Sequence, residues 1–148
     1  MEERFETFTL LIASISRSIR RIKTEEMAEF NLKSPHVSCL YYLYKEDSLT
    51  AKELCDICEE DKASVSRSIE YLEKNGFLLC AAKTQKRYKA PLELTERGQQ
   101  VGKRIVEKID NVLAAASVGV NEECRKIMYR SLEVINANLH KYADRSEG

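Results

Sequence analysis

The sequence lacks several features that assign a chain at once to a large class of proteins. No apolar run approaches the ~20 residues that a membrane span requires, so we expect no membrane association. Low-complexity stretches and internal repeats are also absent, which argues against solenoids and linker-rich proteins. A chain of 148 residues without such features is most simply organised as one domain with a real core.

The chain also lacks a net charge. Lys and Arg together number 24, and so do Asp and Glu. The field of the whole molecule therefore cannot attract a polyanion, and any role in nucleic-acid binding must rest on a local basic patch.

Catalytic and metal-binding signatures are missing as well. The chain has no phosphate-cradling glycine loop, no nucleophile elbow and no metalloprotease helix, so we expect that it is not an enzyme. Its two histidines, His36 and His140, lie far apart in the sequence. Helix-end histidines need no ligand role, and we predict neither a metal site nor a cofactor.

The cysteines are an odd number and no signal-like N-terminus precedes them, which favours a reducing, cytoplasmic location. Cys55 and Cys58 have the spacing of half a zinc site, but no second pair exists, so we interpret them as core residues. Cys124, beside Arg125 and Lys126, leaves a thiol sensor open as an alternative. The five cysteines are Cys39, Cys55, Cys58, Cys80 and Cys124.

Apolar residues at helical spacing, together with capping residues, predict three helices in the N-terminal half of the chain. A stripe of five residues predicts a helix over most of residues 4–29, and Ser34 and Pro35 predict the cap and first turn of a helix over 35–45. Thr50 predicts the cap of a short helix over 51–58 with Leu54, Ile57 and Cys58 inward. The N-terminal stripe consists of Phe8, Ile12, Ile15, Ile19 and Ile22.

Residues 61–76 predict a helix with two distinct faces. Asp61 is the expected cap, and Gly76 supplies the left-handed residue that ends the helix. The core edge is Val65, Ile69 and Leu72. At 100° per residue, the edge away from Val65 holds Ser64, Arg67, Tyr71 and Lys74.

Two short strands should follow this helix. Residues 77–82 are apolar, and residues 88–94 place Leu92 and Leu94 inward, with Pro91 typical of an edge strand. They enclose a basic, polar tip at residues 83–87. Thr95 then predicts the cap of a long helix, and a Val118-Gly119 break precedes a last helix over 121–142 with Ile127, Leu132, Ile135 and Leu139 inward.

The order of a short helix, a tight acidic turn, a second helix and a hairpin with a basic tip is that of a winged helix-turn-helix. The major groove admits one helix, and a hairpin tip can lie along the backbone or in the minor groove. From Lys62 to Lys89 there are seven Lys and Arg and two acids, a local charge of +5. The charged residues in 53–61 are all acidic, so this segment should face away from phosphate.

At three stretches the chain resembles the MarR family of transcription regulators: LTAKEL at 49–54, DKASVSRSIEYLEKNGFL at 61–78 and LELTERG at 92–98. The resemblance implies a mainly α fold with a small β-hairpin wing (α+β). It also implies one domain over 1–148, in which 34–94 form the winged lobe and 1–33 and 95–148 form the dimerisation helices. The chain departs from the family in the turn, where relatives have Gly and an apolar residue and this chain has Glu59 and Glu60.

The resemblance implies a homodimeric regulator, more often a repressor, that binds a pseudo-palindromic operator in double-stranded DNA. Tyr41, Tyr42 and Tyr44 border a crevice where an aromatic or anionic effector binds in the family, although ordinary packing also explains them. Two alternatives stay open, a redox-sensing regulator and a winged helix used only for protein assembly. The predicted DNA-binding residues are Lys62, Ser64, Ser66, Arg67, Ser68, Tyr71, Lys74, Lys83, Lys86 and Arg87.

Overall fold

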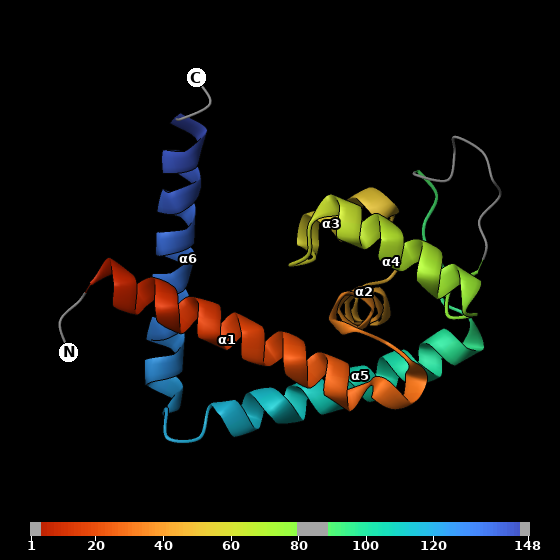
Figure 1. Ribbon diagram of the computed structural model, residues 1–148, viewed down its shortest axis with the longest axis horizontal. Coiled ribbons are helices and arrows are strands. Elements are labelled where there is room, and N and C mark those ends of the chain that lie inside the picture. Colours follow the sequence, from red (N-terminus) through yellow and green to blue (C-terminus); the bar gives the residue numbers. More distant parts are fainter. Residues whose placement is uncertain (1–3, 80–88, 146–148) are drawn as a thin grey trace. The chain divides into compact units, whose positions relative to one another are not determined.

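The computed structural model describes residues 4–79 and 89–145. The helices in chain order are α1 (Phe5–Glu26), the 3₁₀ turn η1 (Ala28–Phe30), α2 (Ser34–Lys45), α3 (Ala51–Ile57), α4 (Lys62–Lys74), α5 (Glu96–Ala116) and α6 (Glu122–Asp144) (Figure 1). The chain divides into two compact units, Met1–Ile109 and Asp110–Gly148. Within the described ranges, no helix has both the length and the apolarity needed to cross a bilayer.

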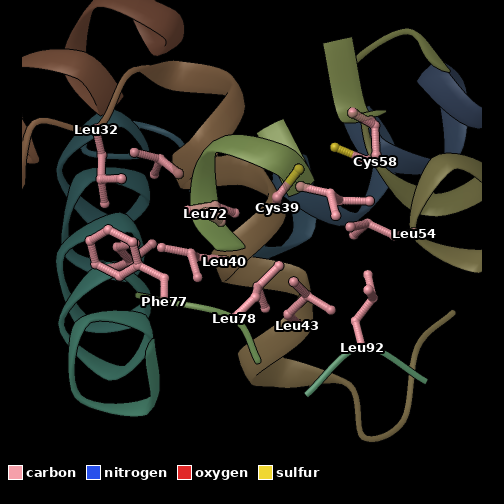
Figure 2. Close-up of a cluster of buried hydrophobic side chains, with 14 of the residues drawn as sticks. Leu32, Cys39, Leu40, Leu43, Leu54, Cys58, Leu72, Phe77, Leu78 and Leu92 are labelled. Atoms are coloured by element: carbon pink, nitrogen blue, oxygen red, sulfur yellow. The ribbon is translucent and has the colours of Figure 1, made fainter. Parts of the chain in front are cut away.

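The first unit is built around α2. This helix packs against α1, α3 and α4, and Val101 and Ile105 bring the first half of α5 into the same core. Figure 2 shows side chains from α2, α3, α4 and the segments after α4 converging in one cluster. The largest fully buried members are Met27, Leu32, Leu40, Leu54, Leu72, Phe77 and Ile105.

Side-chain caps fix where most helices begin. The side chains of Thr50, Asp61 and Asn121 accept hydrogen bonds from the backbone N–H groups of Glu53, Ser64 and Cys124, respectively. Thr95 Oγ1 accepts from Gly98 N at 3.0 Å and stands before the first residue of α5. The predicted caps at residues 50, 61 and 95 are therefore confirmed.

The cap of α2 differs from the prediction. Lys33 is the N-cap residue, and Ser34 is the first residue of the helix and is buried. The backbone N–H of Lys33 donates to His36 Nδ1 at 3.0 Å, while the N–H of Ser34 donates to Thr24 Oγ1 at 3.1 Å. A hydroxyl on α1 and an imidazole of α2 thus take the place that we expected for the Ser34 side chain.

The hairpin wing is not confirmed as a pair of strands. Among the described residues there are two isolated antiparallel bridges, Thr50 to Pro91 and Leu78 to Leu94, and no named strand. Leu79 N donates to Glu93 O at 2.9 Å. The predicted tip at residues 83–87 falls within 80–88, outside the described residues.

Ile57 of α3 and four residues of α6 were expected to face inward but are exposed in the single chain, and the predicted stripe of α1 is also largely exposed. Ile57, the last residue of α3, is 43% exposed. Neither α1 nor α6 contains a buried residue. Their exposed apolar residues include Phe8, Ile12, Ile15 and Ile19 of α1 and Ile127, Leu132, Ile135 and Leu139 of α6.

Candidate nucleic-acid interface

Helix α4 has one face that is free to contact another molecule. Val65, Ile69 and Leu72 are buried, so the opposite side lies in solvent. The Arg67 side chain makes no hydrogen bond or ion pair with any residue that the structure describes. Its guanidinium can therefore form the paired hydrogen bonds that recognise a guanine edge or a phosphate. The exposed residues of α4 are Lys62, Ala63, Ser66, Arg67, Glu70 and Lys74.

The prediction that Ser68 contacts DNA is wrong. It is 2% exposed and lies among the core residues of α4. Its position explains this, because a residue three after Val65 and four before Leu72 shares their face of the helix. The Ser68 hydroxyl instead forms a hydrogen bond with the thiol of Cys39 in α2.

Tyr71 is partly committed to contacts inside the protein. Its hydroxyl donates to the carbonyl oxygen of Asn31 at 2.6 Å, and its ring stacks on His36 with centroids 4.0 Å apart. Burial, with a smaller effect of Lys33, lowers the pKa of His36. Ser64 is also half-buried, so the exposed face is rotated from the predicted edge toward Ser66 and Glu70. A role for Tyr71 and Ser64 in DNA contact stays a prediction.

The turn before α4 is held by ion pairs to α1. Arg20 Nη1 lies 3.1 Å from both carboxylate oxygens of Glu60, whose side chain is 5% exposed. Lys23 Nζ pairs with Glu59, and Ser38 Oγ donates to the same Glu59 oxygen at 2.6 Å. Burial opposes ionisation of Glu59, but hydrogen bonds from Lys23 and Ser38 outweigh it and lower its pKa to about 2.

The end of α4 is joined to the start of α5. Gly76 has φ +80°, and its carbonyl accepts from Thr95 Oγ1 at 2.6 Å. Arg97 donates to Asn75 O at 3.1 Å and lies over the Phe77 ring at 4.4 Å. The base of the predicted wing is thus bound to α5. The basic residues predicted to contact DNA from the wing, Lys83, Lys86 and Arg87, lie outside the described residues.

A cavity of about 200 Å³ is lined by residues of α1, α2, α5 and the turn before α4. Two of the three tyrosines predicted at an effector crevice line it, and their rings meet edge to face at 5.3 Å. Tyr44 lies elsewhere, because its ring packs over Gly102 of α5, where an added Cβ would come within 2.9 Å of Tyr44 Cβ. Burial, then the charge of Glu59, raises the pKa of Tyr42. The lining residues are Lys23, Ser38, Tyr41, Tyr42, Glu59 and Ile109.

The four cysteines that the structure describes are all free thiols. Cys39 and Cys58 are buried, and Figure 2 shows their sulfurs directed toward each other. A hydrogen bond between the two thiols raises the pKa of Cys39 and lowers that of Cys58. Cys124 is exposed, and Cys80 lies outside the described residues. No group of three or more metal-ligating side chains is found within the described ranges.

The ion pairs of Glu59 and Glu60 were missed by sequence reasoning. The acids were expected only to face away from phosphate, and their partners are Lys23 and Arg20, more than 35 residues earlier in the chain. The available signal was the departure from the family pattern at these two positions, together with cations three residues apart on α1.

Comparisons with known proteins support the resemblance. A family model described as the MarR family matches residues 30–87. The Bacillus subtilis protein YdcH, named an HTH-type transcriptional regulator, is 31% identical over 117 residues, which cover 73% of this chain and 78% of YdcH.

Two similar solved structures contain DNA. A MarR family regulator from Listeria monocytogenes in complex with 26mer DNA has a TM-score of 0.77 at 26% identity, covering 94% of this chain and 90% of that one. The S. aureus MepR–DNA complex has a TM-score of 0.78 at 18% identity, covering 93% and 99% of the two chains. The second likeness concerns the fold alone.

Proposed function

The chain belongs to the MarR family of transcriptional regulators, and on that premise we propose that it is a cytoplasmic homodimeric repressor of a pseudo-palindromic operator. As a member of this family it is a DNA-binding transcriptional regulator with a winged-helix fold, and not an enzyme. The proposal adds the homodimer, the repression and the response to an effector. In it, two α4 helices enter successive major grooves about 34 Å apart.

The exposed face of α4 is the observation that carries the proposal. The Arg67 side chain has no hydrogen-bond or ion-pair partner among the described residues and lies near the middle of this face, with Lys62 and Lys74 toward the two ends. Exposed guanidinium and ammonium groups along one helix supply base and phosphate contacts together. Lys83, Lys86 and Arg87 are proposed to reach the backbone or the minor groove from the wing.

The test is the affinity of Arg67→Ala for the selected operator. Fragments bound from random or genomic DNA first identify the operator, and fluorescence anisotropy then gives Kd. We expect a loss of at least about 10-fold and a relaxed preference at one base pair, since a bidentate base contact contributes about 1–3 kcal/mol of discrimination. Arg21→Ala, which removes an exposed arginine from α1, is the matched control.

An unchanged Kd and unchanged base preference for Arg67→Ala would remove this residue from the interface. Neutralising Lys86 and Arg87 together should instead lower affinity evenly across sequences, because phosphate contacts carry no base information. The alternative, a winged helix used only for protein assembly, would be favoured by two results together. The wild type would bind all duplexes equally, and it would bind an acidic protein through its wing.

The homodimer is supported by the unpartnered apolar stripes. Ile12, Ile15 and Ile19 of α1 are between 43% and 55% exposed, and α6 exposes a second stripe. Soluble proteins rarely leave large contiguous apolar patches in water, and long amphipathic helices are stabilised mainly by packing. A second copy of the chain, which carries the same stripes, is the proposed partner.

The cavity lined by Tyr41 and Tyr42 is the proposed effector site. Tyr41 and Tyr42 offer aromatic faces and Lys23 offers a cation, which suits an aromatic or anionic molecule of one ring in about 200 Å³. An effector that binds best to a dimer whose two α4 helices are not spaced to match successive major grooves of B-DNA would release the operator. The coupling free energy between effector and operator binding would be about 1–3 kcal/mol. Titration calorimetry with benzoate and with phenol tests this; a lack of heat with both, and an unchanged operator Kd, would contradict it.

A second candidate, redox sensing, is favoured by the facing thiols of Cys39 and Cys58. A peroxide would oxidise Cys58 to the sulfenic acid, and Cys39 would then displace water to form a disulfide. This pair replaces Cys124 as the candidate sensor. An operator affinity that ignores peroxide in both the wild type and Cys58→Ser would discard this function.

A further inference from the structure

The turn that begins the recognition helix is fastened to α1 at two consecutive residues. Glu60 accepts from Arg20 through both carboxylate oxygens at 3.1 Å. Glu59 pairs with Lys23, and Ser38 of α2 joins the same cluster, with Lys23 Nζ donating to Ser38 Oγ at 2.8 Å. Three elements, α1, α2 and the turn, therefore meet in one polar network.

These contacts are shielded more than ordinary surface ion pairs. The side chain of Glu60 is 5% exposed and that of Lys23 is 11% exposed. A pair with one shielded partner is screened less by solvent than a pair that is exposed on both sides. The Arg21–Glu25 pair of the same helix, 79% and 59% exposed, is an ordinary surface pair.

The position of the network connects it to DNA recognition. Asp61, the next residue after Glu60, caps α4 and accepts from Ser64 N at 2.7 Å. Arg67 lies on the second turn of the same helix. On the other side, Arg20 follows Ile19, which belongs to the exposed stripe of α1. The network thus joins the start of the DNA-contacting helix to the helix that carries the proposed dimer surface.

We propose that Glu59 and Glu60 are positioning residues for DNA recognition, which hold the start of α4 in a fixed orientation against α1 without contacting DNA. The proposal rests on the proposed operator binding. Holding α4 in place before binding removes part of the entropic cost of association. Loss of the contacts between α1 and Glu59 or Glu60 therefore lowers the affinity for DNA even though no DNA contact is lost. In a dimer it also fixes the separation of the two recognition helices.

The experiment is a double-mutant cycle of Arg20→Gln, Glu60→Gln and the double variant, measured as operator Kd by fluorescence anisotropy. The matched control is the same cycle on Arg21 and Glu25, which changes the same charges within α1 alone. We expect each single change at Arg20 or Glu60 to weaken binding about 10-fold, and the double variant to be no weaker than either single variant. The control cycle should stay within about 2-fold.

Glu60→Gln is the most informative variant because it makes the protein more cationic, which on its own favours binding to a polyanion. A Kd equal to or below that of the wild type, or strictly additive losses in the cycle, would overturn the positioning role. Glu59→Gln should weaken binding in the same direction, and an unaltered Kd would remove Glu59 from it.

A second readout does not depend on DNA. Amide hydrogen exchange over residues 58–66, in free protein, should be faster in Glu60→Gln than in the wild type and unchanged in Glu25→Gln. Equal exchange rates in Glu60→Gln and the wild type would show that the Arg20–Glu60 ion pair does not hold this segment in place. If the wild type binds no duplex, the proposed function fails, while the exchange experiment still decides whether the tie exists.

Discussion

Individual side chains in this protein often serve two neighbouring elements at once. Tyr71 of α4 stacks on His36 of α2 and donates to Asn31, so one residue joins three segments. Glu59 does the same through charge, since it accepts from Lys23 of α1 and Ser38 of α2. The contacts of Tyr71 are one reason that the exposed face of α4 differs from the edge expected from helical spacing alone.

Replacing Glu59 by Gln should lower stability in a manner that depends on pH. Because the folded protein lowers the Glu59 pKa from 4.5 to about 2, the carboxylate stabilises the folded state above pH 4.5. This stabilisation is lost as the pH falls from 4.5 toward 2. We expect Glu59→Gln to cost about 1 kcal/mol of unfolding free energy at pH 7, a value reduced by the partial exposure of the group.

Urea denaturation of both proteins at pH 7, 5, 4 and 3 measures the difference. It should shrink steadily below pH 4.5, and a difference that is constant or grows on acidification would contradict the assignment of the ion pair. Glu25→Gln, in a pair exposed on both sides, should cost no more than about 0.5 kcal/mol at pH 7.

At the scale of the elements, the start of helix α5 closely approaches the segment that follows α4. Gly98 in its first turn leaves no space for a side chain, because an added Cβ would lie 2.1 Å from the carbonyl oxygen of Phe77. This contact fastens α5 beside the segment that follows α4. The hydrogen bond from Thr95 N to Phe77 O, at 3.0 Å, lies at the same place.

Gly98→Ala should therefore be strongly destabilising. Backbone cannot yield as a flexible side chain does, so α5 must shift from Phe77, and we expect a loss of about 3 kcal/mol. The gain of about 1 kcal/mol in helix propensity is too small to compensate. Thermal and urea unfolding give the measurement. Gln100→Ala, at an exposed position of α5, should change stability by less than about 0.5 kcal/mol, and an equally small effect at Gly98 would refute the contact.

Helix positions were predictable because the apolar period and the caps act locally. The stripe of Val65, Ile69 and Leu72 and the cap at Asp61 located α4 to within its observed bounds, Lys62–Lys74. What failed depended on distant partners. The Tyr71 ring is partly covered because it stacks on His36, and no periodicity within α4 contains that information. The burial of Ser68, in contrast, follows from the same helical spacing that places Val65 and Leu72 in the core.

The candidate site was predictable only in part for the same reason. The exposure of Arg67 was predictable because it lies opposite the core edge on its own helix. The ties of Glu59 and Glu60 to Lys23 and Arg20 join residues 36 and 40 positions apart, and charge alone did not indicate which cations would be near. The cavity likewise needs α1, α2 and α5 together before its lining exists.

At the scale of the whole molecule, a single copy leaves much apolar surface in water. The first four turns of α1 expose isoleucines and leucines, and α6 contains no buried residue. The proposed homodimer covers these surfaces. The stability of the dimer should therefore depend on the α1 stripe. A carboxylate introduced into this stripe would be buried and unpaired in the dimer, which carries a large desolvation cost.

Ile12→Glu should therefore convert the dimer to a monomer at micromolar concentration. We expect the dimer Kd to rise at least about 100-fold, equivalent to about 2.8 kcal/mol. Light scattering after size exclusion, or sedimentation equilibrium, measures the mass. Ala13→Glu adds the same charge at an exposed position outside the stripe and should leave the mass unchanged. If wild type is already a monomer, or if both variants behave alike, the stripe is not the interface.

The C-terminal end of α1 is held by ionic contacts on two sides, by Glu59 and Glu60 of the turn and by Lys108 of α5. Arg104 of α5 adds an ion pair to Glu29 in the adjoining turn η1. Added electrolyte weakens these internal pairs at the same time as it competes at phosphates. A plot of log K against log salt for operator binding will thus be steeper than the number of neutralised phosphates requires. The count of released counterions inferred from that slope will overestimate the cations that touch DNA.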